Sequence, residues 1–244
     1  MSFIGLTFVG VGPGDPSLLT IASIQAIKAS TIIAYPVSEG NVDGIAANIA
    51  SDWFSDTQVK LPLKFPMVSE PEPLLKAWGI AAEKLASLVE RGEQVVFLCE
   101  GDVSLFASSS YLLKCLQSSH SGCPIRLIPG VTSISAAAAL GAYPLALQND
   151  QLLVVPAPED SETLEALLDE AASKRRVLVI IKLGHRWAWV RPLLNKKGLL
   201  NKTLFAERIG FTDEKVTSAI HVEESPRPYF SLLIIRQSWP EIMP

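Results

Sequence analysis

Short apolar runs alternate with amphipathic stretches through the first part of the chain. Residues 3–11 form an apolar, β-branched run that predicts a strand, and residues 17–28 carry apolar side chains at helical spacing. The run 95–99 is apolar at every position, as a central strand is when helices cover both faces of a parallel sheet. Strands are also predicted at 31–35, 58–61 and 125–128, and helices at 42–53, 74–91 and 131–140.

The segment 141–150 has no hydrophobic period and predicts a domain boundary. Beyond it, strands are predicted at 151–155, 176–182, 203–207, 215–219 and 229–236, with helices near 161–172 and 187–194. The last strands follow one another without a helix, which favours a mixed sheet. We therefore expect an α/β protein of two domains. Residues 1–145 would hold a mostly parallel, doubly wound sheet, and residues 146–244 a mixed α/β sheet.

Composition narrows the class of protein. A chain of 244 residues with 48% hydrophobic side chains can bury a core without disulfides or a structural metal. Its net charge of −4 argues against nucleic-acid binding, and no apolar run reaches the roughly 20 residues of a membrane span. The beginning of the chain lacks the basic segment of a signal peptide. The three cysteines form no CxxC pair, and no histidine pair has metal-ligand spacing, so we expect a cytoplasmic protein without a bound metal.

The sequence GVGPGDP at 10–16 follows the first predicted strand directly. The carboxyl ends of strands are where open α/β sheets bind ligands, and glycine permits a close approach to them. Asp15 and Pro16 suit the start of a helix. The dinucleotide motif would require glycine at Asp15 and an acid near Tyr35, so a nicotinamide or flavin enzyme is disfavoured.

Two further turns follow predicted strands, at 100–106 and at 128–135. The first contains a Gly-Asp pair, which is also common in ordinary loops. The second continues from Pro-Gly into Thr132, Ser133 and Ser135, whose hydroxyls could bind a ligand or cap the helix. Three glycine-containing turns are thus predicted at one edge of one sheet.

Taken in order, these three elements resemble the tetrapyrrole-methylase family over essentially the whole chain. Within it, the segment 9–20, the strand end 34–36 and the segment 63–67 resemble the branch that methylates C20 of precorrin-2. Pro36 stands where uroporphyrinogen-III methyltransferases usually carry an acid, and Val103 departs from the proline that commonly follows the Gly-Asp turn.

The resemblance implies a homodimeric methyltransferase with S-adenosyl-L-methionine as co-substrate and S-adenosyl-L-homocysteine as product. It implies methylation of precorrin-2 to precorrin-3A, or of cobalt-factor II to cobalt-factor III, in cobalamin (porphyrin) biosynthesis. The alternatives are a tetrapyrrole methylase acting at another ring carbon and a non-catalytic nucleotide-binding regulator. The cofactor-binding residues that it implies are Pro13, Glu100, Gly101, Asp102, Leu105, Thr132, Ser133, Leu183 and Ile209.

A tetrapyrrole substrate is a polycarboxylate, which an acidic protein binds through well-placed cations. The candidates are Lys64, Lys182, Arg186 and Arg191. The two arginines lie beside tryptophans, an arrangement that suits a flat ring but equally an ordinary amphipathic helix. Methyl transfer to C20 must be followed by loss of a proton, for which Asp102, Tyr111, Glu207 or water are the candidate bases.

Overall fold

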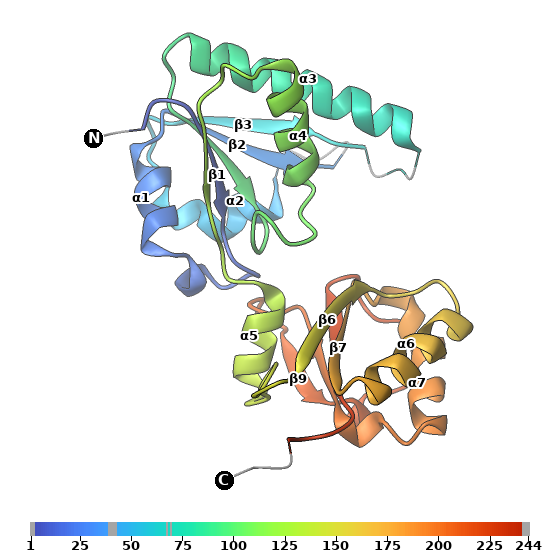
Figure 1. Ribbon diagram of the computed structural model, residues 1–244. Coiled ribbons are helices and arrows are strands. Elements are labelled where there is room, and N and C mark those ends of the chain that lie inside the picture. The colour runs from blue at the N-terminus through green and yellow to red at the C-terminus, as the bar shows by residue number, and fades with distance from the viewer. Residues whose placement is uncertain (1–2, 39–42, 67, 69, 241–244) are drawn as a thin grey trace. The chain divides into compact units, whose positions relative to one another are not determined.

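A computed structural model describes residues 3–38, 43–66, 68 and 70–240 of the chain (Figure 1). The chain forms two compact units, Met1–Thr132 and Ser133–Pro244. In the described residues, each unit is built around a five-stranded sheet, so the predicted α/β class and the two sheets are confirmed. None of the helices in the described segments is long and apolar enough to cross a bilayer.

The sheet of the first unit is parallel throughout, with the strand order β3-β2-β4-β1-β5. The central strands β4 and β1 are entirely buried, as the uniformly apolar sequence of β4 and the largely apolar sequence of β1 predict. The strands are β1 (Leu6–Gly10), β2 (Ile32–Val37), β3 (Val59–Lys64), β4 (Val95–Cys99) and β5 (Ile125–Ile128).

Side chains alternate across this sheet, and each face is covered by its own pair of helices. Phe8 and Phe97 pack in one cluster with α3 (Pro71–Glu90) and α4 (Ser109–Ser119), whereas Val9 and Leu98 pack in the other with α1 (Ile21–Ala29) and α2 (Ile45–Ala50). Figure 1 shows the two pairs on opposite sides of the strands. The first unit is therefore doubly wound, as predicted.

The helix predicted at 42–53 is shorter in the structure. Position 42 lies outside the described residues, and α2 passes at Ser51 into the 3-10 turn η2 (Ser51–Trp53). A second 3-10 turn, η1 (Pro16–Leu18), is capped by the Asp15 carboxylate, which accepts a hydrogen bond from Ser17 N at 2.8 Å. Asp15 and Pro16 thus begin a turn, as their types predict.

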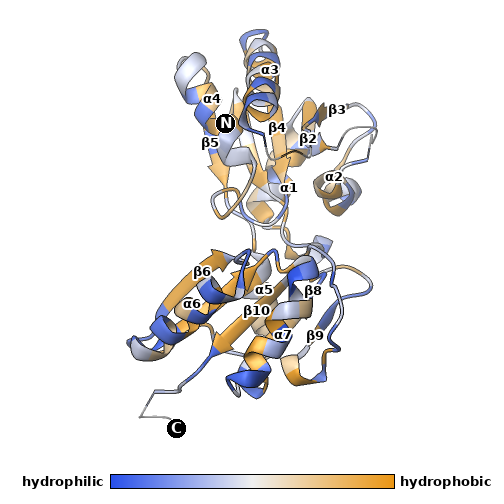
Figure 2. Ribbon diagram, turned by 90° about the vertical axis from the view of Figure 1, so that its right-hand side faces the viewer, coloured by the Kyte–Doolittle hydropathy of each residue, from blue (hydrophilic) through white to orange (hydrophobic). Residues whose placement is uncertain are grey.

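The sheet of the second unit has the order β6-β7-β10-β8-β9, with only the pair β6-β7 parallel among the described strand pairs. Helices α6 and α7 lie on one side of it and α5 on the other, and its strands are largely apolar (Figures 1 and 2). The remaining elements are α5 (Ser133–Leu140), β6 (Gln151–Pro156), α6 (Ser161–Ser173), β7 (Arg176–Ile181), η3 (Gly184–Arg186), α7 (Trp187–Lys196), η4 (Leu200–Lys202), β8 (Thr203–Glu207), β9 (Lys215–Ser218), η5 (Ala219–His221) and β10 (Ser231–Arg236).

The compact units divide between Thr132 and Ser133, before the boundary expected at 145/146, so α5 lies in the second unit. The segment after α5 is anchored to the second sheet. Arg236 donates to Asp150 Oδ2 at 2.5 Å and to the Pro144 carbonyl at 3.0 Å, and both partners of this ion pair are almost completely buried. A segment without hydrophobic period is thus fixed to the sheet through polar contacts.

Helix α5 ends at a left-handed residue. Ala142 has a φ of +46°, and the backbone bonds from Tyr143 N to Ala138 O and from Ala142 N to Ala139 O complete a Schellman motif. Alanine pays a steric cost in this conformation that glycine does not. We expect Ala142→Gly to raise the free energy of unfolding by about 1 kcal/mol, measured by urea denaturation followed by circular dichroism.

Ala139→Gly is the matched control, because Ala139 is exposed and lies within α5. The same substitution there removes helix propensity and should lower the free energy of unfolding by about 0.5 to 1 kcal/mol. If both substitutions changed the free energy of unfolding in the same direction, the role of Ala142 as a left-handed helix cap would be contradicted.

Candidate functional site

The candidate ligand site of the first unit lies at the carboxyl ends of β1 and β4. These strands are neighbours in the sheet, but the chain leaves β1 toward α1 on one face and β4 toward α4 on the other. Connections that diverge in this way leave an opening at the strand ends, where open α/β sheets bind ligands.

Three glycines bring the turns after β1, β4 and β5 into direct backbone contact. A Cβ at Gly10 would lie 2.5 Å from Gly130 N, and a Cβ at Gly130 would lie 2.1 Å from Gly101 O. No side chain fits at Gly10 or Gly130 without moving the neighbouring backbone. Glycine at these two positions is therefore required by packing between turns that are distant in sequence.

The first two turns are also hydrogen-bonded to each other. Gly12 N donates to Gly101 O at 3.2 Å, and Gly101 N donates to Gly12 O at 2.8 Å. Both glycines have positive φ, +82° and +63°. A Cβ built at Gly101 meets nothing within 4 Å, so one side of this junction is open to a ligand while the other side is closed by backbone.

Asp102 ties the second turn to the third. Its Oδ1 accepts from Ser104 N at 2.9 Å and from Ser104 Oγ at 2.5 Å, and its Oδ2 accepts from Gly130 N at 2.9 Å. Burial alone raises the pKa of Asp102, but the hydrogen bonds from Ser104, Gly130 and Val103 outweigh it and hold the pKa below its ordinary value. These bonds hold the turn even though Val103 replaces the family's proline.

The other predicted cofactor residues of the first unit lie along the same turns. Pro13 follows the Gly12–Gly101 bridge and is half-buried, and Leu105 is 40% exposed. Burial raises the pKa of Glu100, and no described residue donates a hydrogen bond to its carboxylate, which leaves an acceptor for a ligand. Thr132 is the last residue of the first unit and Ser133 the first of the second.

In the second unit, the predicted residues Leu183 and Ile209 are buried and lie at one sheet edge. Leu183 N donates to Ser231 O at 3.0 Å, which places it beside the start of β10, and Ile209 comes two residues after β8 on the other side of that strand. Lys182 lies at this edge with a φ of +58°, and no described residue pairs with its ammonium group.

The predicted substrate cations have different environments. Arg186 forms an ion pair with Glu159, and Arg191 Nε donates to Val222 O at 2.6 Å, so contacts within the second unit account for both guanidinium groups. Trp187, between them, is completely buried, as an ordinary amphipathic helix predicts. Lys64 is exposed at the carboxyl end of the edge strand β3. Substrate binding by these residues stays a prediction.

The three candidate bases also differ. Both carboxylate oxygens of Asp102 are occupied in holding the turns. Tyr111 lies on α4, is 56% exposed and stacks on Trp78 with ring centroids 4.3 Å apart. Glu207 ends β8, and its buried Oε2 has no hydrogen-bond partner among the described residues. Among the three candidates, only Glu207 has a carboxylate oxygen without a hydrogen-bond partner in the described residues, and its role as the base stays a prediction.

An aromatic cluster at the same edge of the second sheet was missed by sequence reasoning. It consists of Arg208, Phe211, Tyr229 and Phe230. Residues 229–230 were predicted as the beginning of a strand, but β10 begins at Ser231 and both rings are exposed. The signal was a Tyr-Phe pair directly before an apolar run, which alone does not separate a strand from an exposed turn.

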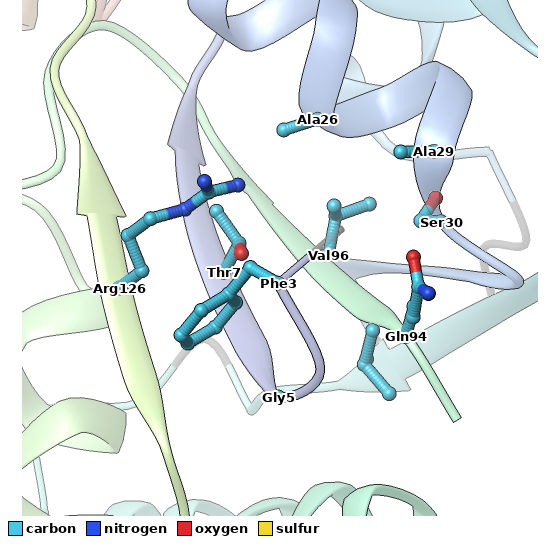
Figure 3. Close-up of a pocket in the computed structure, with 10 residues that line it drawn as sticks. Phe3, Gly5, Thr7, Ala26, Ala29, Ser30, Gln94, Val96 and Arg126 are labelled. Atoms are coloured by element: carbon cyan, nitrogen blue, oxygen red, sulfur yellow. The ribbon is translucent and has the colours of Figure 1, made fainter. Parts of the chain in front are cut away.

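A small cavity lies at the opposite, amino-terminal end of the first sheet (Figure 3). Its volume of about 20 Å³ has room for roughly one water molecule, so it is too small for a cofactor. Figure 3 shows Arg126 beside Phe3, and the guanidinium lies 5.0 Å from the ring centroid. This cavity is separate from the glycine turns.

The first unit is thus a doubly wound α/β unit in which three glycine-containing turns pack together at the carboxyl ends of the strands. The sequence model of the family described as Tetrapyrrole (Corrin/Porphyrin) Methylases matches residues 5–220. The chain belongs to this family.

Relatives of known name align over almost the full length. The Cobalt-precorrin-2 C(20)-methyltransferase of Salmonella typhimurium is 29% identical, covering 95% of both chains. The Precorrin-2 C(20)-methyltransferase of Sinorhizobium sp is 28% identical, covering 96% of this chain and 97% of the relative. The Probable cobalt-precorrin-2 C(20)-methyltransferase of Methanocaldococcus jannaschii is 31% identical, covering 94% of each.

Solved structures show the same fold. The methyltransferase CobJ superposes with a TM-score of 0.70 at 22% identity, covering 98% of this chain and 97% of its own. The Uroporphyrin-III C-methyl transferase of Thermus thermophilus, complexed with S-adenyl homocysteine, superposes with a TM-score of 0.61 at 21% identity, covering 96% and 97%.

The close glycine contacts predict a large effect of one methyl group. Gly10→Ala places its Cβ against backbone atoms that no rotamer change can move, and it should lower the free energy of unfolding by about 3 kcal/mol. Gly79→Ala is the control, since a Cβ there meets nothing within 4 Å and alanine favours helix α3 by about 1 kcal/mol. Urea denaturation measures the free energy of unfolding of both variants. Similar values for Gly10→Ala and Gly79→Ala would contradict the close backbone contact at Gly10.

Asp102→Asn tests the carboxylate that joins the turns. Asparagine keeps one acceptor oxygen and turns an N–H₂ group toward a backbone donor, so the variant should be less stable by about 1 to 3 kcal/mol at neutral pH. A lowered folded-state pKa means that the stabilisation is present above the usual value of 3.8 and is lost as the pH falls through the folded-state pKa.

The stability difference between the wild type and Asp102→Asn should therefore narrow on acidification below about pH 4. Urea denaturation at neutral and acid pH measures it. A difference that does not change with pH would show that the ionised carboxylate is not what stabilises the turns.

Proposed function

We propose that this protein transfers a methyl group from S-adenosyl-L-methionine to C20 of precorrin-2 or of its cobalt-bearing counterpart in cobalamin biosynthesis. The observation that carries the proposal is the end-to-end alignment with relatives named for this reaction. The Uroporphyrinogen-III C-methyltransferase of Bacillus subtilis aligns over only 56% of the chain, at 33% identity, so methylation at another ring carbon is less well supported.

The glycine turns suit a nucleoside-type cofactor. The open side of Gly101 admits close approach of a ligand to backbone, and the Glu100 carboxylate lacks a donor in the described protein. Ionised carboxylates accept hydrogen bonds from ribose hydroxyls and ammonium groups. The residues that would hold the cofactor are Pro13, Glu100, Gly101, Leu105, Thr132, Ser133, Leu183 and Ile209, with Asp102 holding the turns in place.

The bound cofactor supplies an electrophilic methyl group with a good leaving group. The protein's own part is then mainly positioning, because holding the reacting carbons in an attack geometry provides much of the acceleration. The Gly10–Gly101–Gly130 junction and the Asp102 bonds keep the turns from shifting. Glu207, whose Oε2 has no described partner, is our first candidate for accepting the proton that leaves C20.

The proposal includes a homodimer, as the family resemblance implies, in the cytoplasm, as the pattern of cysteines suggests. The printed names of the relatives include both the metal-free and the cobalt-bearing substrate. The two macrocycles present the same carbon and similar carboxylates, so the same site chemistry serves both. Analytical ultracentrifugation of the full chain would measure the assembly.

Single-turnover transfer of a ¹³C-labelled methyl group tests the reaction. The protein, labelled S-adenosyl-L-methionine and either precorrin-2 or cobalt-factor II are mixed under anaerobic conditions, and NMR locates the label. We expect the label at C20 of one of the two macrocycles. A label at another ring carbon would overturn the regiochemistry, and cofactor binding without transfer to either would favour a nucleotide-binding regulator.

A further inference from the structure

Two basic residues end strands on either side of β10 in the same unusual backbone conformation. Lys182 follows β7 with a φ of +58°, and Arg208 follows β8 with a φ of +50°. Left-handed conformations of non-glycine residues cost free energy, and they persist where the surrounding structure imposes them, often at functional sites. The fold thus holds one cation on each side of the start of β10.

Exposed aromatic rings lie between these cations. Tyr229 and Phe230, directly before β10, are 55% and 38% exposed, and their ring centroids are 5.5 Å apart in an edge contact. Phe230 also stacks on Phe211, with centroids 6.2 Å apart and planes 18° apart. Arg208 N donates to Phe230 O at 2.8 Å, which fixes the turn after β8 against these rings.

The two cations at this edge differ in whether an acidic side chain already pairs with them. The Arg208 guanidinium lies over the Phe211 ring, 4.6 Å from its centroid, and its Nε donates to Asp213 at 2.7 Å, so Asp213 neutralises part of its charge. Lys182 is half-buried and has no pairing group among the described residues. Lys182 is therefore the cation at this edge that can pair with an anionic group of a ligand.

We propose that Lys182, Arg208, Phe211, Tyr229 and Phe230 form a platform that binds the tetrapyrrole substrate, with the rings against its flat face and the cations on its carboxylates. This inference rests on the proposed function and identifies the substrate-binding surface of the second unit. Aromatic faces and arginine pack against conjugated rings, and an ammonium group pairs with a carboxylate. The platform replaces Arg186 and Arg191, whose guanidinium groups are already paired, as the main substrate contact of this unit.

Lys182→Met and Tyr229→Leu, made in the full chain, test the platform. Both residues are at least partly exposed, so we expect folded variants, which thermal melting checks. Lys182→Met should raise the KM for the tetrapyrrole about tenfold with little change in kcat, because it removes a charge-assisted contact. Tyr229→Leu should raise the same KM several-fold, while the Kd for S-adenosyl-L-methionine, from calorimetry, stays within about twofold of the wild type.

Arg175→Met is the matched control. Arg175 is exposed in the same unit and has a φ of +51°, but it precedes β7 and so lies at the opposite end of that strand from Lys182. It loses the same charge in the same backbone conformation, and the tetrapyrrole KM should not change. If Arg175→Met raised the tetrapyrrole KM as much as Lys182→Met does, the cause would be the loss of overall positive charge, and the platform would be overturned.

Titration with uroporphyrin, a stable macrocycle with a carboxylate on every side chain, separates the platform from the proposed reaction. Quenching of porphyrin fluorescence should give a Kd that Lys182→Met raises about tenfold and that depends less on salt in that variant. Wild-type affinity in both Lys182→Met and Tyr229→Leu would overturn the platform even if methyl transfer occurs. If the wild type transfers no methyl group, the proposed function fails, and the titration still decides the platform; no uroporphyrin binding in that case overturns both.

Discussion

Direct contact between the backbones of Gly10, Gly101 and Gly130 is the constraint on which the first unit's site depends. The three turns leave neighbouring strands at one edge, and their backbones approach to distances that exclude a Cβ at two of the three positions. At the third position, Gly101, a Cβ would meet nothing within 4 Å. Close packing on one side and space on the other arise from the same residue type, and they occur at the strand ends, where open α/β sheets bind ligands.

Asp102 and Arg236 illustrate two ways in which a buried charge stabilises a connection. Asp102 satisfies backbone donors of two turns, and Arg236 joins the last strand to the segment after α5 through Asp150 and the Pro144 carbonyl. In each case the charged group is hydrogen-bonded rather than isolated, which offsets the cost of removing it from water. These hydrogen bonds fix irregular segments of both units to the structure around them.

Much of the architecture followed from hydrophobic pattern alone. The strands β4, β5 and β8 occupy the predicted residues, because short runs rich in apolar residues between turn signals have few other solutions in an α/β chain. The sequence also determined the turn after β1, since Asp15 and Pro16 have strong local preferences. Local chemistry was sufficient wherever the decisive interaction joins residues that are near in sequence.

Tertiary structure decided the rest. Helix α5 lies in the second unit, and the segment after it is bonded to Arg236 of β10 through residues 144 and 150, contacts that no local pattern encodes. The sequence named Lys182 as a substrate cation but gave no sign that Arg208, Tyr229 and Phe230 lie beside the same strand ends. Strand order brings β7, β10 and β8 together, and order is a property of the packed sheet, so side chains far apart in the chain become neighbours only when it forms.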